Sequence, residues 1–141
     1  MLNDDIKQWT ILLVDDEPDN LDFTQKMLEF YGAQVHSARN GLEGLKLLET
    51  ITPTLILLDL SMPQMDGWEM FKAIRALPHG DKLPVIALTA HAMTSHRKQV
   101  AEEGFDGYLA KPFRLKELVA EMRRVVQANI PDSVASDHSG N

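Results

Sequence analysis

Leu55-Ile56-Leu57-Leu58 is an uninterrupted apolar run that ends at an aspartate, Asp59, and Ile11-Leu12-Leu13-Val14 is a second run that ends at Asp15. Short apolar runs without polar alternation are typical of strands that helices cover on both faces. A longer amphipathic stretch follows each run, so strands and helices are expected to alternate along the chain. The two runs therefore predict a parallel sheet at the centre of an α/β domain.

The alternation extends over five repeats of strand and helix. The predicted strands are residues 9–14, 33–37, 55–58, 85–88 and 107–110, and the predicted helices are residues 21–31, 42–49, 68–77, 97–103 and 115–127. Pro18 suits a first helical turn and Gly32 suits a helix end, whereas Pro53 and Pro84 come just before strands. This order predicts an open, doubly wound α/β fold.

Length and composition limit the class of protein. The 141 residues are 44% hydrophobic and 25% charged, which is typical of one globular domain that builds its own core. We expect this domain to cover residues 9–128, after an extension of residues 1–8. Residues 129–141 are expected to form a disordered tail, because the sequence from Pro131 onward is small and polar.

The same numbers indicate a compartment and a kind of partner. No apolar stretch approaches the roughly 18 residues of a spanning helix, and no signal-peptide pattern is present, so we expect no membrane association. Cysteine is absent, which is compatible with the cytoplasm, the expected compartment. The net charge of -7 argues against binding to nucleic acid, because such binding needs Lys and Arg to neutralise phosphates.

Polar side chains follow four of the five predicted strands. Ligands of a doubly wound sheet bind beyond the carboxyl ends of its strands, where the sequence places Asp15, Asp16, Asp59, Thr89 and Lys111. Crowded carboxylates favour a bound cation, and oxygen ligands select a hard ion such as Mg²⁺. A carboxylate that attacks a phosphoryl donor forms an aspartyl phosphate, whose developing charge metal, ammonium and hydroxyl groups stabilise. The sequence thus predicts a magnesium-dependent phosphoryl-transfer site.

The stretches that carry these groups resemble the motifs of the response-regulator receiver family. They are Val14-Asp15-Asp16-Glu17, Leu58-Asp59-Leu60-Ser61-Met62-Pro63-Gln64-Met65-Asp66-Gly67, Leu88-Thr89-Ala90 and Leu109-Ala110-Lys111-Pro112-Phe113. Their order, and their places after predicted strands, make the match specific over residues 9 to 127. The resemblance implies a flavodoxin-like fold with five helices around a parallel sheet of strand order 2-1-3-4-5. It also implies a stand-alone response regulator in two-component or phosphorelay signalling.

The resemblance further implies which residues bind the phosphoryl group and which bind the metal ion. Asp59 would accept the phosphoryl group. Mg²⁺, or Mn²⁺ as a substitute, would be bound by Asp16, Asp59 and the main-chain carbonyl of Ser61, and by Asp15 through a water. Lys111 would contact the phosphoryl group.

A switch is implied as well. The hydroxyl of Thr89 would move to the phosphoryl group, and the ring of Tyr108 would turn inward to follow it. The peptide bond between Lys111 and Pro112 is expected to be cis, which only an X-Pro bond adopts at small cost.

Two side chains would border the path of the water that removes the phosphoryl group. By the resemblance these are Ser61 and His91, and neither is an acid or an amide that orients a water well. Slow self-dephosphorylation is therefore expected.

Partners follow from the same resemblance. The donor would be a sensor histidine kinase or a histidine phosphotransfer protein. A downstream protein would bind the face made by the fourth helix, the fifth strand and the fifth helix. With no external substrate, the chain would be a signalling module rather than an enzyme.

Two other functions stay open. A phosphatase of the haloacid-dehalogenase type also uses a strand-end aspartate and Mg²⁺, but it needs an acid two residues later, where Ser61 stands. An interaction domain that works without phosphorylation is the second alternative, and the complete set of site residues argues against it.

Several residues also have ordinary structural interpretations. Asp15 and Asp16 would suit a helix amino terminus, Thr89 a strand and Tyr108 a packed strand aromatic. Residues 41–44 are expected to begin a helix rather than form a phosphate loop, and Asp66-Gly67 to form a turn. His91 and His96 are spaced wrongly for zinc on one helical face, and Arg123 and Arg124 suit a solvated helix face.

Overall fold

The computed structural model describes residues 6–60, 62, 65–90 and 94–128, with the side chains of residues 94–96 excepted. Its sheet has five parallel strands in the order β2-β1-β3-β4-β5, as predicted. The strands are β1 (Thr10–Val14), β2 (Gln34–Ala38), β3 (Leu55–Asp59), β4 (Val85–Thr89) and β5 (Gly107–Ala110). Among these residues no helix has both the length and the apolar character needed to cross a bilayer.

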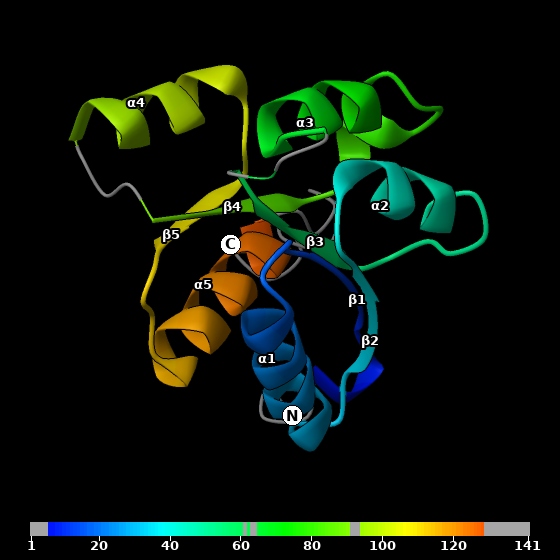
Figure 1. Ribbon diagram of the computed structural model, residues 1–141, viewed down its shortest axis with the longest axis vertical. Helices are drawn as coiled ribbons and strands as arrows, with labels where there is room; N and C mark the ends of the chain where they lie inside the picture. The colour runs from blue at the N-terminus through cyan, green and yellow to red at the C-terminus, as the bar shows by residue number, and fades with distance from the viewer. Residues whose placement is uncertain (1–5, 61, 63–64, 91–93, 129–141) are drawn as a thin grey trace, which may run out of the picture.

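The α-helices of the described residues cover both faces of the sheet, an arrangement that Figure 1 shows. One face carries α1 (Pro18–Phe30) and α5 (Leu115–Ala128), and the other carries α2 (Gly41–Leu47), α3 (Gly67–Arg75) and α4 (Thr94–Glu103). A short 3-10 helix, η2 (Gly80–Lys82), precedes β4 and was not predicted. The predicted doubly wound α/β class is therefore confirmed.

The apolar strand runs are explained by burial on both faces. Ile11 and Leu13 pack in the cluster beneath α1 and α5, whereas Leu12 and Val14 pack in the cluster beneath α2, α3 and α4. Successive strand side chains point to opposite faces, so a doubly covered strand buries apolar residues on both faces along most of its length. Ile6, assigned to an extension by sequence, is also buried in the first cluster.

Helix boundaries follow local rules that the sequence carries. Pro18 is the first residue of α1, three residues before the predicted start, and Gly32 beyond its end has a φ of 100°. Residue Gly41 begins α2, so the helix prediction for residues 41–44 is confirmed. Asp66 caps α3 in a reciprocal pair with Glu69, where the sequence had suggested only a turn.

Arg75 joins α3 to the loops before β4 and β5. Its Nη1 donates hydrogen bonds to the carbonyl oxygens of Gly80 and Leu83, at 2.9 and 2.7 Å. Its Nη2 donates to Asp106 Oδ2 at 3.0 Å, an oxygen that also accepts the N–H of Val85 at 2.8 Å. One guanidinium thus fixes the start of two strands.

Replacement of Arg75 should therefore destabilise the domain. Arg75→Ala leaves the partly buried Asp106 carboxylate and three carbonyl groups without this donor, and we expect the free energy of unfolding to fall by about 2 kcal/mol. Urea denaturation at pH 7 measures the effect. Lys72→Ala, at an exposed position of the same helix, should change stability by less than about 0.5 kcal/mol. Equal midpoints for the two variants would contradict the role of Arg75.

Candidate functional site

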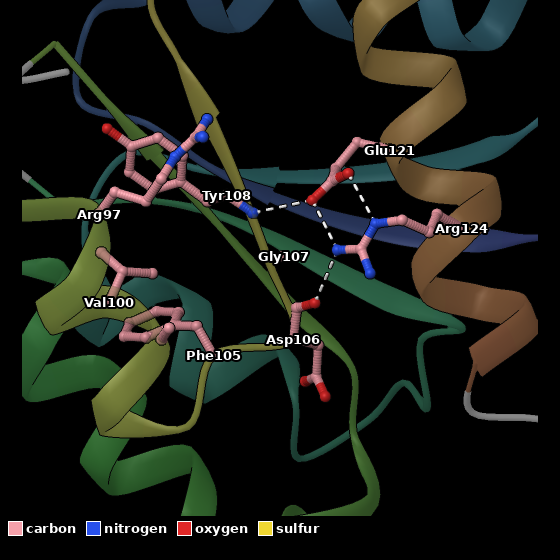
Figure 2. A pocket seen from close by; sticks show the side chains of 9 residues that line it. Arg97, Val100, Phe105, Asp106, Gly107, Tyr108, Glu121 and Arg124 are labelled. Atoms are coloured by element: carbon pink, nitrogen blue, oxygen red, sulfur yellow. Dashed lines mark hydrogen bonds and ion pairs between the residues drawn. The ribbon is translucent and has the colours of Figure 1, made fainter. Parts of the chain in front are cut away.

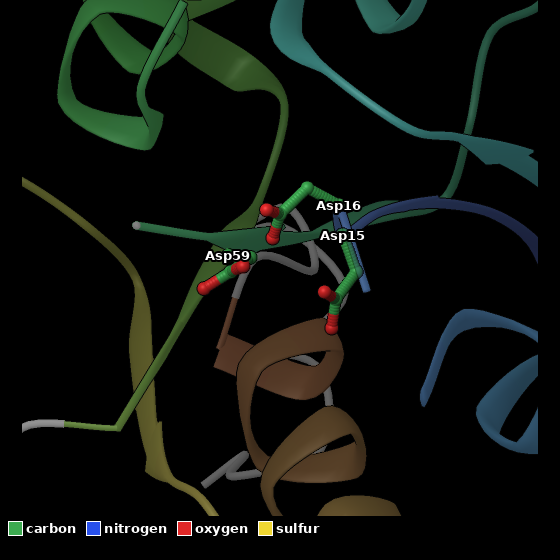
Figure 3. A group of neighbouring side chains, drawn as sticks. All are labelled: Asp15, Asp16 and Asp59. Atoms are coloured by element: carbon green, nitrogen blue, oxygen red, sulfur yellow. The ribbon is translucent and has the colours of Figure 1, made fainter. Parts of the chain in front are cut away.

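Three carboxylates meet at the carboxyl edge of the sheet. Asp15 and Asp16 directly follow β1, and Asp59 is the last residue of the neighbouring β3. One carboxylate oxygen from each lies within 4.8 Å of the other two. Figure 3 shows the three side chains as neighbours at this edge. The structure thus brings together the three aspartates that the sequence placed after two strands.

The carboxylates are crowded and partly shielded from water. The exposed fraction is 3% for Asp15 and 4% for Asp59, and Asp16 is less buried. Burial of like charges at this spacing is unfavourable unless cations compensate them. The set offers oxygen ligands only, which fits a hard divalent ion such as Mg²⁺.

Lys111 supplies one compensating cation. Its Nζ lies 2.8 Å from Asp15 Oδ2 and 3.7 Å from Asp59 Oδ2. The backbone N–H of Lys111 donates to the carbonyl of Thr89, which holds the residue at the end of β5, and the Lys111–Pro112 bond is cis as expected. The ammonium group therefore lies between two of the three carboxylates.

Asp15 is held at both of its oxygens. Besides the ion pair of Oδ2 with Lys111, Oδ1 accepts the N–H of Glu17 at 3.0 Å. The N-cap of α1 is Glu17, without a side-chain cap, so neither Asp15 nor Asp16 is the N-cap of this helix.

A tight contact positions Asp59. A Cβ at Gly67, the first residue of α3, would overlap the carbonyl oxygen of Asp59, and it would lie 2.6 Å from the Cα of Leu60. Glycine at this position lets the start of α3 approach the end of β3. The loop between the two elements includes Ser61, which lies outside the described residues.

The two residues predicted to switch occupy the adjacent strands. Thr89 is the last residue of β4, rather than the first after it, and is fully buried. Tyr108 lies in β5, is half-buried and packs beside the cluster beneath α2, α3 and α4. Residue His91 and the side chain of His96 lie outside the part of the chain that the structure describes, so the predictions for them stay predictions.

A cavity of about 470 Å³ adjoins Asp15. Asp15 and Lys111 form part of its wall, and the aromatic side chains of Phe23 and Phe113 form another part. Phe23, on α1, is 65% exposed. The helical pattern of α1 indicated no role for Phe23, and only its place in the fold shows that it borders the site.

The model of the response regulator receiver domain family matches residues 11–123. The chain belongs to this family. Members bind Mg²⁺ at an acidic site and work in two-component signalling with histidine kinases and downstream effectors, as phosphoacceptors. This receiver domain presents such an acidic site in Asp15, Asp16 and Asp59.

Known relatives of this receiver domain differ in length. It is 43% identical over 128 residues to a 14.6 kDa protein of the sodA1 3′ region of Leptolyngbya boryana, covering 91% of this chain and 98% of that protein. It is 38% identical over 127 residues to the response regulator MprA of Mycolicibacterium vanbaalenii, covering 90% of this chain. The match spans 54% of MprA, so the chain corresponds to about half of that regulator.

A solved structure gives a relative with a metal. The receiver domain of a Pseudomonas aeruginosa sensor histidine kinase has 34% sequence identity and a TM-score of 0.77, over 84% of this chain and 98% of that one. In that protein a magnesium ion is coordinated in the active-site cleft.

A second polar cluster of this receiver domain lies along the free edge of β5, as Figure 2 shows. Arg124 donates to both carboxylate oxygens of Glu121, at 3.0 and 2.8 Å, and to the carbonyl of Asp106 at 3.1 Å. Glu121 Oε2 also accepts the N–H of Tyr108 at 3.0 Å. The hydrogen bond from Arg124 lowers the pKa of Glu121 below its usual value.

This cluster adds a contact to the solvated helix face that the sequence predicted for Arg124. Arg124 is exposed, as predicted, and it also donates to the carbonyl of Asp106, the residue just before β5. A pair three residues apart on a helix is usually a surface pair. The sequence held no sign that this one reaches β5.

Proposed function

We propose that Asp59 accepts a phosphoryl group from a phosphohistidine of a partner protein. The observation that supports this most directly is the cluster of Asp15, Asp16 and Asp59 within 4.8 Å, with the Lys111 ammonium between two of them. An oxygen of Asp59 attacks phosphorus, the bond from phosphorus to the histidine nitrogen breaks, and that nitrogen leaves with the bonding electrons. The product is an aspartyl phosphate.

The remaining groups of the site would bind Mg²⁺ and stabilise the charge of the phosphoryl group. Asp16, Asp59 and the carbonyl of Ser61 would hold Mg²⁺, for which Mn²⁺ is a possible substitute, and Asp15 would act through a bound water. The ion would neutralise charge on the phosphoryl oxygens. Lys111 lies 3.7 Å from Asp59 Oδ2 and would turn from Asp15 toward the new phosphate.

The signal would pass through the neighbouring strands. The hydroxyl of Thr89 would bond the phosphoryl group, and the ring of Tyr108 would turn inward into the space this movement leaves. Tyr108 lies on the face of α4, β5 and α5, where a cavity of about 320 Å³ opens between the three elements. We propose that a downstream protein binds this face.

The proposed module is the receiver domain alone. Ile6 belongs to the core, so we place the start of the domain by residue 6 instead of residue 9, and its end near residue 128. The match over 98% of the 14.6 kDa relative supports a stand-alone regulator. The absence of cysteine is compatible with a cytoplasmic location.

Phosphotransfer tests the proposal. The protein with Mg²⁺ is mixed with a histidine phosphotransfer protein that carries labelled phosphate, and separately with a small phosphate ester. We expect the label to move to this chain and the ester to remain intact. Catalytic turnover of the ester would favour a phosphatase. If neither reaction occurs and acetyl phosphate is also inert, the result would favour an interaction domain that works without phosphorylation.

The lifetime of the aspartyl phosphate gives a separate prediction. Ser61 and His91 are proposed to border the path of the attacking water, and neither side chain orients it well. Ser61→Asn combined with His91→Glu should therefore speed the loss of label several-fold, in the presence of Mg²⁺ and after removal of the donor. Wild-type decay as fast as that of the double variant would show that these side chains do not set the lifetime.

A further inference from the structure

We infer that Arg97 is a positioning residue for Tyr108: its guanidinium holds the ring between α4 and β5 and opposes the inward turn of the switch. The inference rests on the proposed function of Tyr108. It concerns the equilibrium between two positions of the ring, and Arg97 takes no part in the transfer of phosphate itself.

The contact between the two side chains carries the inference. The Cζ atom of Arg97 lies 4.8 Å from the centroid of the Tyr108 ring, within the range of a cation–π interaction. Figure 2 shows the guanidinium beside the ring, with Arg97 coming from α4 and Tyr108 from β5. Both side chains line the cavity of about 320 Å³ on this face.

The backbone of Tyr108 is held independently of its ring. Its N–H donates to Glu121 Oε2 from α5, and Arg124 fixes that carboxylate from the other side. Glu121 also feels the charge of Arg97, which contributes to the lowered pKa of the carboxyl group. The ring can therefore turn about its own side-chain bonds while the strand stays in place, and Arg97 keeps a nearby counter-charge when the ring leaves.

The contact between Arg97 and Tyr108 also matters for how α4 is attached to the sheet. Among residues 97–103 of α4 only Val100 is buried, so few apolar side chains hold this part of the helix. The cation–π contact of Arg97 with Tyr108 adds a point of attachment for this part of the helix. When the ring turns inward, α4 loses that point and the wall of the cavity changes, which is a change that a partner protein on this face can detect.

Linkage fixes the sign of the effect. We assign the observed position of the Tyr108 ring, in contact with Arg97, as the outward position. A group that favours this position opposes any ligand that favours the inward ring, and the two effects are reciprocal. Beryllofluoride with Mg²⁺ mimics the phosphoryl group on Asp59 and would favour the inward ring. Loss of an exposed cation–π contact should raise the apparent affinity for beryllofluoride about two- to five-fold.

The experiment compares four forms of the full chain by NMR titration with beryllofluoride at fixed Mg²⁺. We expect Arg97→Ala to bind more tightly than wild type, Arg97→Lys to lie between them because it keeps a cation, and Lys98→Ala to match wild type. The ring resonances of Tyr108, assigned by comparison with Tyr108→Phe, should shift toward their ligand-bound positions in unliganded Arg97→Ala. Unchanged resonances and unchanged affinity in Arg97→Ala would overturn the inference.

A double-mutant cycle separates the ring from any other role of Arg97. In a Tyr108→Leu background, Arg97→Ala should leave the affinity for beryllofluoride unchanged. An equal gain in both backgrounds would show that Arg97 acts elsewhere and would refute the inference. Failure of the wild type to bind beryllofluoride would instead count against the proposed function of the site.

Discussion

Asp59→Asn is expected to abolish phosphorylation of the protein. With Mg²⁺ and acetyl phosphate, the wild type should gain the mass of one phosphoryl group and the variant should gain none. The amide that replaces the carboxylate has nearly the same shape but is a far weaker nucleophile toward phosphorus. Intact-protein mass spectrometry at neutral pH measures the result.

The neighbouring carboxylates are poor substitutes for Asp59. Both oxygens of Asp15 are engaged, by Lys111 and by the N–H of Glu17. Asp16 is the most exposed member of the cluster, and we propose that it binds Mg²⁺. Phosphorylation that survives in Asp59→Asn would show that one of these two accepts the group, and the central proposal would fail.

Stability in chelator shows whether Asp59→Asn is folded. The substitution removes two like-charge contacts, with Asp15 and Asp16, and one attraction, to Lys111 at 3.7 Å. The net effect without metal should be a gain in the free energy of unfolding on the order of 1 kcal/mol. An unstable variant would make its failure to accept phosphate uninformative, and the urea midpoint in chelator checks this directly.

The positions of the three aspartates could be predicted from the sequence because they depend mainly on the topology of the sheet. A parallel sheet aligns the carboxyl ends of all its strands, so Asp15, Asp16 and Asp59 meet at one edge wherever their strands pair. The apolar runs before them identify those strands without knowledge of any distant contact. Strand assignment therefore places the three carboxylates at one edge, and the strand order that the resemblance implied, with β1 beside β3, brings them together.

Contacts that depend on side-chain rotamers and loop conformations could not be predicted from the sequence. Arg75 and Asp106 are 31 residues apart, in a helix and a loop, and no local pattern links them. The nearer partner of Lys111 is Asp15 rather than Asp59, which depends on side-chain geometry at the edge of the sheet. The same holds for Arg97 and Tyr108, whose contact requires the packing of α4 on β5.

Asp16→Asn is expected to weaken magnesium binding more than Asp15→Asn does. Among the residues that the structure describes, no hydrogen bond or ion pair engages the carboxylate of Asp16, so its full charge is available to a cation. Asp15 shares its charge with Lys111 at 2.8 Å. Loss of a full charge next to a divalent ion at the protein surface should lower the affinity about tenfold or more.

Asp15→Asn should also lower the affinity for Mg²⁺, but by a smaller factor than Asp16→Asn. Once its partner is neutral, the Lys111 ammonium is free to approach Asp59, now 3.7 Å away, and a cation there competes with Mg²⁺. Isothermal titration with Mg²⁺ at pH 7 and constant ionic strength measures both variants. Asp19→Asn, an exposed acid in the first turn of α1, controls for the change in net charge. Equal losses in Asp15→Asn and Asp16→Asn would contradict the distinction between a direct and a water-mediated ligand, because that distinction requires Asp16 to carry the larger share.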